Sequence, residues 1–176
     1  MTSSPVQILF VLGGARSGKS RYAQGRAEAL SRSRVYIATA QPFDAEMQER
    51  IACHQADRGA GWQTIEAPLK LPEAITVHSG PDRVVLVDCL TLWASNLLLA
   101  EEDAEAATDR LVDAIRSARG PVVLVANEVG LGIVPDNALA RRFRDIAGRI
   151  NQATAAAAHE CVAVLAGLPL VLKHPA

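Results

Sequence analysis

Short continuous runs of apolar residues alternate along the chain with longer stretches in which apolar positions recur every three or four residues. The short runs are typical of buried strands, and the periodic stretches are typical of amphipathic helices. Strands are predicted at Val6–Leu12, Val35–Ala40, Trp62–Glu66, Val84–Val87, Pro121–Ala126 and Cys161–Ala166, with a short edge strand at Leu170–Leu172. Helices are predicted at Gly18–Leu30, Asp44–Ala56, Leu90–Ala100, Ala104–Ala118 and Asn137–Ala158.

The alternation of strands with helices predicts an α/β fold. Such an order favours a mostly parallel sheet with helices on both faces. The short edge strand predicted near the carboxyl end of the chain is a candidate for antiparallel pairing with its neighbour. At 176 residues the chain is expected to form a single domain over residues 1–176.

Composition narrows the class of protein. Hydrophobic residues make up 49% and charged residues 21% of the chain, which is a globular composition. The formal net charge of -1 gives no electrostatic footprint for nucleic acid or for an anionic membrane. No apolar run reaches the roughly 18 residues of a membrane span. Three cysteines without a C-x-x-C pair favour a reducing, cytoplasmic location.

The strongest chemical signal is a phosphate loop at Gly13-Gly14-Ala15-Arg16-Ser17-Gly18-Lys19-Ser20. It matches G-x-x-x-x-G-K-[ST] and lies between a predicted strand and a predicted helix, as the motif requires. Its amides would cradle phosphate oxygens, and the helix would present its positive end. Lys19 would reach the β- and γ-phosphates, and Ser20 would bind Mg²⁺. The motif predicts a fold of the P-loop NTPase kind that binds a nucleoside triphosphate.

Asp88 is a second candidate metal ligand, because it ends an apolar strand. A carboxylate there can hold Mg²⁺ directly or through water. The alternative interpretation is that Asp88 only caps the helix that begins near Leu90. Thr39 and Ala40 end another strand beside the phosphate loop, and we expect them to contact nucleotide.

A phosphate loop alone does not decide between kinases, switch GTPases, motor ATPases and nucleotidyltransferases. The chain has no N-K-x-D guanine signature, so a small-molecule kinase is the first expectation and a nucleotide-dependent switch protein the alternative. His54 shares one face of its predicted helix with Met47 and Ile51. From periodicity alone, a core or interface histidine is favoured over a catalytic one.

The sequence closely resembles the bifunctional adenosylcobinamide kinase/adenosylcobinamide-phosphate guanylyltransferase family of cobalamin biosynthesis. Several blocks carry the resemblance from Ile8 to about Lys173. They are Gly13–Arg21, Tyr36–Ala40, Glu46–His54, Trp62–Glu66, Asp88–Thr91, Asn127–Pro135 and Arg142–Asn151. The phosphate loop is generic, whereas NEVGLGIVP followed by RFRDIAGRIN is specific to the family.

The resemblance implies two successive reactions. Adenosylcobinamide is phosphorylated with ATP or GTP, and GMP is then transferred from GTP through a guanylylated histidine to give adenosylcobinamide-GDP. The matching residue here is His54, whose neighbour is Cys53 where some family members carry a second histidine. The resemblance also implies a homotrimer, and guanine or ribose contacts at Arg58 and Glu66.

Other charged residues carry weaker expectations. Glu128 is a candidate for a metal-water or substrate contact, and Arg141, Arg142 and Arg144 either bind substrate phosphate or form a solvated helix face. The chain is poor in aromatic residues, so the sequence indicates no stacking surface for the corrinoid.

Overall fold

The computed structural model describes residues 7–41 and 61–175, and these form one seven-stranded sheet in the order β3-β2-β4-β5-β1-β6-β7. The strands pair in parallel except β7, which is antiparallel to β6. Their bounds are β1 Ile8–Gly13, β2 Ser33–Ala38, β3 Trp62–Glu66, β4 Arg83–Asp88, β5 Val122–Asn127, β6 Glu160–Leu165 and β7 Leu168–Lys173. The antiparallel edge strand is confirmed, and it begins earlier than the sequence predicted.

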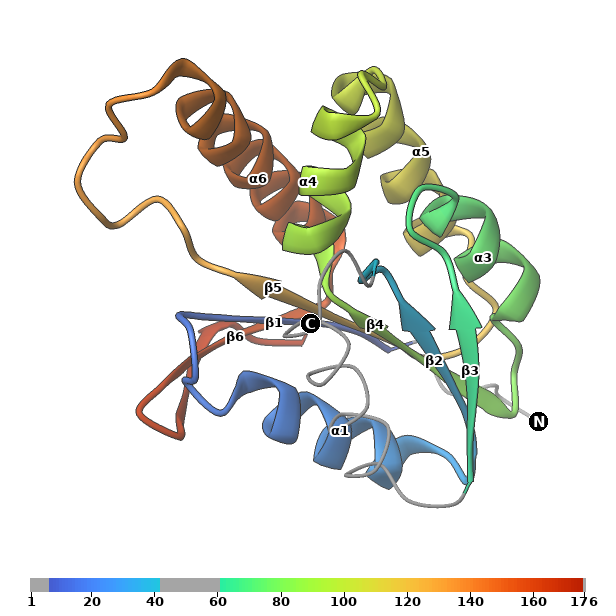
Figure 1. Ribbon diagram of the computed structural model, residues 1–176. Helices are drawn as coiled ribbons and strands as arrows, with labels where there is room; N and C mark the ends of the chain where they lie inside the picture. Colours follow the sequence, from blue (N-terminus) through green and yellow to red (C-terminus); the bar gives the residue numbers. More distant parts are fainter. Residues whose placement is uncertain (1–6, 42–60, 176) are drawn as a thin grey trace.

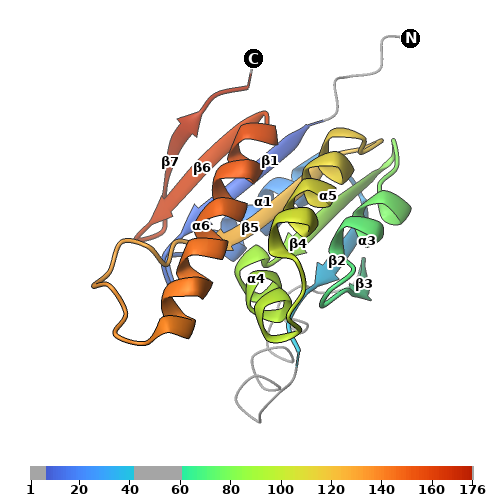
Figure 2. The same ribbon diagram turned by 90° about the horizontal axis from the view of Figure 1, so that it is seen from above.

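Helices cover both faces of the sheet (Figure 1). Of the helices in the described part of the chain, α1 (Lys19–Leu30) lies on one face, and the others lie side by side on the opposite face (Figure 2). These are α3 (Leu71–His78), α4 (Leu90–Leu99), α5 (Ala104–Arg116) and α6 (Ala138–Ala157).

Burial on both faces explains the continuous apolar runs of the sequence. Successive side chains of a strand point to opposite faces. In β1, Ile8 and Phe10 belong to the core beneath α3–α6, whereas Leu9 and Val11 belong to the core beneath α1. A central parallel strand must therefore be apolar at nearly every position, as observed in β1, β4 and β5.

The sequence analysis missed α3. Its short length and the proline at its start obscured the pattern, although proline is well tolerated in the first turn of a helix. Leu71 and Ile75, one turn apart, are both fully buried. His78 is the last residue of this helix. The helix predicted at Asp44–Ala56 lies outside the described residues.

A charged pair ties α1 to the start of β6. Arg26 donates from Nη1 to Glu160 Oε1 at 2.9 Å and from Nη2 to Glu160 Oε2 at 2.7 Å. Its Nη1 also donates to the hydroxyl of Tyr22 at 2.8 Å. The guanidinium lowers the pKa of Glu160, against the opposing effect of burial. The two-point geometry and the buried carboxylate make this pair more than a surface salt bridge.

Among the described helices, none is long and apolar enough to cross a membrane.

We predict that Glu160→Gln lowers the free energy of unfolding by about 1–3 kcal/mol at pH 7, because it leaves the guanidinium of Arg26 without its carboxylate. A depressed pKa stabilises the fold above the ordinary carboxyl value of about 4.3, and this contribution is lost as the pH falls through the folded-state pKa. The difference between wild type and variant should therefore shrink below about pH 4. Urea denaturation at both pH values measures it.

The exposed pair Arg144–Asp145 provides the matched control. Asp145→Asn should change the free energy of unfolding by less than about 0.5 kcal/mol. Equal losses in the two variants would contradict the role assigned to Glu160.

Candidate active site

The phosphate loop, residues 13–20, connects the end of β1 to the start of α1 as the motif requires. Gly18 has a φ of 93°, a left-handed conformation that glycine adopts at little cost. The side chain of Lys19 is largely buried, and its Nζ donates to the carbonyl oxygen of Gly14 at 3.1 Å. The ammonium group is thus folded back over the loop, where it can act on phosphate oxygens bound by the loop amides.

Two neighbouring segments fix the loop from either side. The amide of Glu128, just after β5, donates to the carbonyl oxygen of Gly13 at 3.0 Å. The amide of Gly167, in the turn between β6 and β7, donates to the carbonyl oxygen of Ser17 at 2.8 Å. A Cβ added at Gly18 would come within 3.3 Å of Gly167 Cα, so the turn packs directly against the loop.

Asp88 ends β4 and is oriented by contacts on both sides. The hydroxyl of Tyr36, on β2, donates to Asp88 Oδ2 at 3.0 Å. Thr39 is fully buried, and its hydroxyl donates to the carbonyl oxygen of Cys89 at 2.7 Å and accepts from the Cys89 amide at 2.9 Å. The Tyr36 bond positions the Asp88 carboxylate, and the Thr39 bonds hold the backbone of the next residue, Cys89. The predicted contacts of Thr39 and of the half-buried Ala40 with nucleotide stay predictions.

The charges of Lys19 and Asp88 both influence the pKa of the buried Cys89 thiol. Burial, and after it the charge of Asp88, raise the pKa of Cys89 to about 11, and the charge of Lys19 opposes this rise. Strand β5 lies between β4 and β1, so two strand spacings of about 4.8 Å separate Asp88 from the phosphate loop strand. A carboxylate at that separation suits a water-mediated contact with an ion at Ser20.

The donors present fit Mg²⁺. Ser20, in the first turn of α1, and Asp88 offer hydroxyl and carboxylate oxygens, the ligand type that Mg²⁺ prefers. Within residues 7–41 and 61–175 no group of three or more His, Cys, Asp or Glu side chains gathers to hold a metal.

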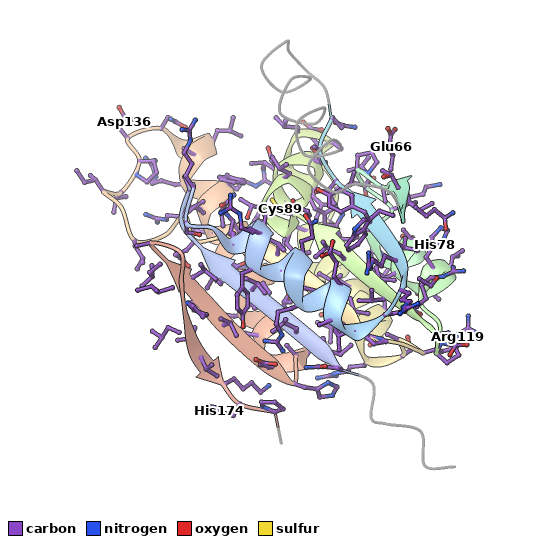
Figure 3. The ribbon with its side chains drawn as sticks, turned by 90° about the horizontal axis from the view of Figure 1, so that it is seen from below. Glu66, His78, Cys89, Arg119, Asp136 and His174 are labelled. Carbon is purple, nitrogen blue, oxygen red and sulfur yellow. The ribbon has the colours of Figure 1, made fainter. Side chains whose placement is uncertain are left out.

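Not every candidate residue lies at this site. Glu66 is exposed at the end of the edge strand β3, four strand spacings or roughly 19 Å from β1. Figure 3 shows it on the opposite side of the molecule from Asp136, which belongs to the loop after β5. His54 and Arg58 lie outside the described residues. The predicted roles of these three residues therefore stay predictions.

The loop after β5 belongs to the block Asn127–Pro135, which contributes to the family resemblance. Its Glu128 accepts a hydrogen bond from the Gly130 amide through Oε1, so this carboxylate shapes the loop. Arg141 donates from Nη1 to the carbonyl oxygens of Pro135 and Asp136 at 2.9 and 2.7 Å, and Arg144 pairs with Asp145. These contacts give Arg141 and Arg144 structural partners. The contacts of Glu128 and Arg142 with substrate stay predictions.

Sequence reasoning missed Tyr36 and Gly167. Tyr36 lay inside an apolar run that was interpreted only as a strand, although strand alternation places its side chain on the α1 face with that of Ala38. Gly167 follows Ala166 between two apolar runs, a signal for a tight hairpin, and both residues have positive φ. Predicting that this turn packs against the phosphate loop would have required the strand order, which no local sequence pattern contains.

Comparison with known proteins identifies the family. The model of the family described as "Cobinamide kinase / cobinamide phosphate guanyltransferase" matches residues 9–172. The chain belongs to this family. The match includes the phosphate loop, His54, Asp88 and the loop after β5, and it confirms the resemblance inferred from the sequence blocks.

Curated relatives of this family are similar over nearly their full length. The chain is 45% identical over 165 residues to the bifunctional adenosylcobalamin biosynthesis protein CobP of Pseudomonas aeruginosa, covering 93% of this chain and 95% of that protein. It is 45% identical over 184 residues to CobU of Salmonella typhimurium, covering 94% and 99%. A solved structure from Pyrococcus horikoshii has a TM-score of 0.54 at 8% identity, covering 96% of this chain and 86% of that one, and shows likeness of fold alone.

We predict that Gly13→Ala weakens nucleotide binding at least tenfold, or by about 1.4 kcal/mol. The added Cβ would lie 2.6 Å from Ser17 Oγ and 2.6 Å from the backbone oxygen of Val164, so the phosphate loop must shift. Titration of a fluorescent GTP analogue measures the affinity.

Gly25→Ala in α1 is the matched control, because a Cβ there meets nothing within 4 Å. It should leave the affinity unchanged and raise stability by about 0.5–1 kcal/mol through helix propensity. If Gly13→Ala bound the analogue as tightly as Gly25→Ala, the packing behind the loop would not control nucleotide binding.

Proposed function

We propose that the chain catalyses both reactions of its family on one phosphate loop: phosphorylation of adenosylcobinamide by a nucleoside triphosphate, then transfer of GMP from GTP to the new phosphate. The observation that carries this proposal is the intact, braced phosphate loop with Lys19 folded over it, in a chain that the family model matches over residues 9–172. Both ATP and GTP serve as phosphoryl donors in this proposal.

In the kinase step, the substrate hydroxyl oxygen attacks the γ-phosphorus and the nucleoside diphosphate leaves, while the hydroxyl proton passes to solvent. The loop amides and Lys19 hold the phosphates in place and stabilise the charge that develops on their oxygens. Ser20 and Asp88 hold Mg²⁺, which supplies further charge neutralisation when bound. The hydrogen bond from the Tyr36 hydroxyl holds the Asp88 carboxylate in its orientation.

In the guanylyl step, a neutral imidazole nitrogen of His54 attacks the α-phosphorus of GTP and pyrophosphate leaves. An oxygen of the cobinamide phosphate then attacks the same phosphorus, and the imidazole is released. His54 supplies the nucleophile, Lys19 and the loop supply charge stabilisation, and Arg58 and Glu66 contact the guanine or the ribose. A cytoplasmic location suits an enzyme that uses ATP and GTP.

The proposed assembly is a homotrimer, as the resemblance implies. Strand β7 supports association between copies, because no strand of residues 7–41 and 61–175 pairs with its outer edge. Its apolar side chains are also exposed: 72% for Leu168, 54% for Leu170 and 58% for Leu172. An exposed apolar edge strand is an aggregation hazard that proteins usually cover.

His54→Ala should abolish guanylyl transfer and keep phosphorylation of adenosylcobinamide, because only the second reaction needs the imidazole. Lys19→Ala should reduce both reactions by at least about a hundredfold, since the lysine acts on phosphates in each. Incubation with GTP labelled at the α-phosphate, followed by denaturation, measures the covalent intermediate. The label should be acid-labile, alkali-stable and absent from His54→Ala.

Absence of covalent label on the wild type in the presence of Mg²⁺ would exclude guanylyl transfer through a protein intermediate. Phosphorylation of another hydroxylated compound, but not of adenosylcobinamide, would indicate a different kinase. Hydrolysis without any acceptor would favour a switch protein.

Replacement of Leu170 and Leu172 by glutamate should shift the protein to a monomer, because each introduced charge would be buried at the contact between copies. Light scattering after size-exclusion chromatography measures the mass. Val77→Glu on α3, where Val77 is 68% exposed, is the control and should keep the wild-type mass. Unchanged mass in the β7 variant would remove β7 from the interface.

A further inference from the structure

The loop between β5 and α6 carries a cluster of exposed apolar side chains. Leu131 is 90%, Ile133 98% and Val134 62% exposed, and Leu139 in the first turn of α6 is also exposed. We call these four residues the apolar rim. Scattered apolar residues on a surface are ordinary, but a contiguous group in one loop marks a binding surface.

The loop that carries the apolar rim is anchored at both ends by hydrogen bonds. At its start, the Thr91 hydroxyl accepts from the Asn127 amide at 2.7 Å, and the Asn151 side chain donates to the Asn127 carbonyl oxygen at 3.3 Å. At its end, the two bonds from Arg141 hold Pro135 and Asp136, and Asn137 caps α6 by accepting from the Ala140 amide at 2.7 Å. The rim residues thus lie on a loop whose two ends are anchored to the body of the protein.

The loop begins at the nucleotide site. Glu128 donates to Gly13 of the phosphate loop, and β5 is the immediate neighbour of β1 in the sheet. Figures 1 and 2 show the orange loop leaving the same edge of the sheet as the phosphate loop. Ligands of parallel α/β sheets bind outside the carboxyl ends of the strands, which is this edge.

The apolar side chains of β7 are placed differently. Because β7 is antiparallel to β6, it starts beside the phosphate loop at Leu168 and runs back to the opposite edge, where Lys173 pairs with Cys161. Most of its apolar surface therefore lies away from the phosphate loop.

The substrate explains why an apolar surface belongs at this edge. The hydroxyl of adenosylcobinamide that accepts phosphate ends a short arm, so the corrin ring must lie within that arm's reach of the γ-phosphate. The ring is too large to enter the phosphate loop, and its methyl-bearing faces need apolar contact. Phe10 and Trp93 are buried in the core and offer no stacking surface.

We propose that the apolar rim is the platform on which the corrin ring of adenosylcobinamide rests during both reactions. This inference rests on the proposed function and deepens it by naming where the macrocycle binds. Leu131 and Ile133 make apolar contact with the ring, and the loop's attachment to Gly13 sets the distance between the ring and the phosphates.

The test is the double variant Leu131→Ser/Ile133→Ser. These side chains are almost wholly exposed, so the fold should persist, and circular dichroism checks that it does. The dissociation constant for adenosylcobinamide, from equilibrium dialysis followed by its visible absorbance, should rise at least tenfold. In the kinase reaction KM for adenosylcobinamide should rise likewise, while kcat and the affinity for a fluorescent GTP analogue stay as in the wild type.

Val77→Ser is the matched control, because Val77 is also exposed but lies on α3, and it should bind adenosylcobinamide as the wild type does. Unchanged affinity for adenosylcobinamide in the double variant would overturn the proposal. A change in oligomeric mass would overturn it as well, since the rim would then be a contact between copies. A wild type that bound the GTP analogue but not adenosylcobinamide would overturn both this inference and the proposed function.

Discussion

Everything proposed for this protein depends on how the phosphate loop is held between its neighbours. The loop carbonyl oxygens of Gly13 and Ser17 accept amides from the segment after β5 and from the β6–β7 turn. Binding of a triphosphate therefore requires little ordering of the loop, and its amides and Lys19 are set before substrate arrives. The same two contacts fix the position of the β5–α6 loop and of β7 relative to the phosphates, so the nucleotide site organises the surfaces around it.

The pattern of apolar positions was sufficient to predict the strands, because this sheet is buried on both faces. Burial on both faces makes every central strand an uninterrupted apolar run. The pattern was insufficient for α3, where Pro72 and a short length hid a helix that packing against α5 stabilises. The phosphate loop was predictable because its residues are contiguous. The Tyr36–Asp88 bond and the Gly167–Ser17 bond were not, because they join segments that only the strand order brings together.

If one phosphate loop serves both phosphorylation and GMP transfer, as we propose, other residues of the site must determine which reaction occurs. The loop and Lys19 serve any displacement at a phosphorus atom, whereas the α-phosphorus reaction needs the additional nucleophile assigned to His54. The corrinoid need not be recognised by the loop either, because in our proposal the apolar rim gives it a separate surface. In this account the phosphate loop stabilises the charge of the phosphates, and the apolar rim contacts the apolar faces of the corrin ring.

The claim that one phosphate loop serves both reactions is tested most directly by counting nucleotide sites. The measurement is equilibrium dialysis with a GTP analogue that carries a methylene bridge between the α- and β-phosphates. This bridge prevents transfer of GMP to His54. The account predicts one analogue bound per chain and its complete displacement by ATP, in keeping with the single G-x-x-x-x-G-K-[ST] match in the sequence. Two analogues per chain, or binding that ATP does not displace, would contradict it.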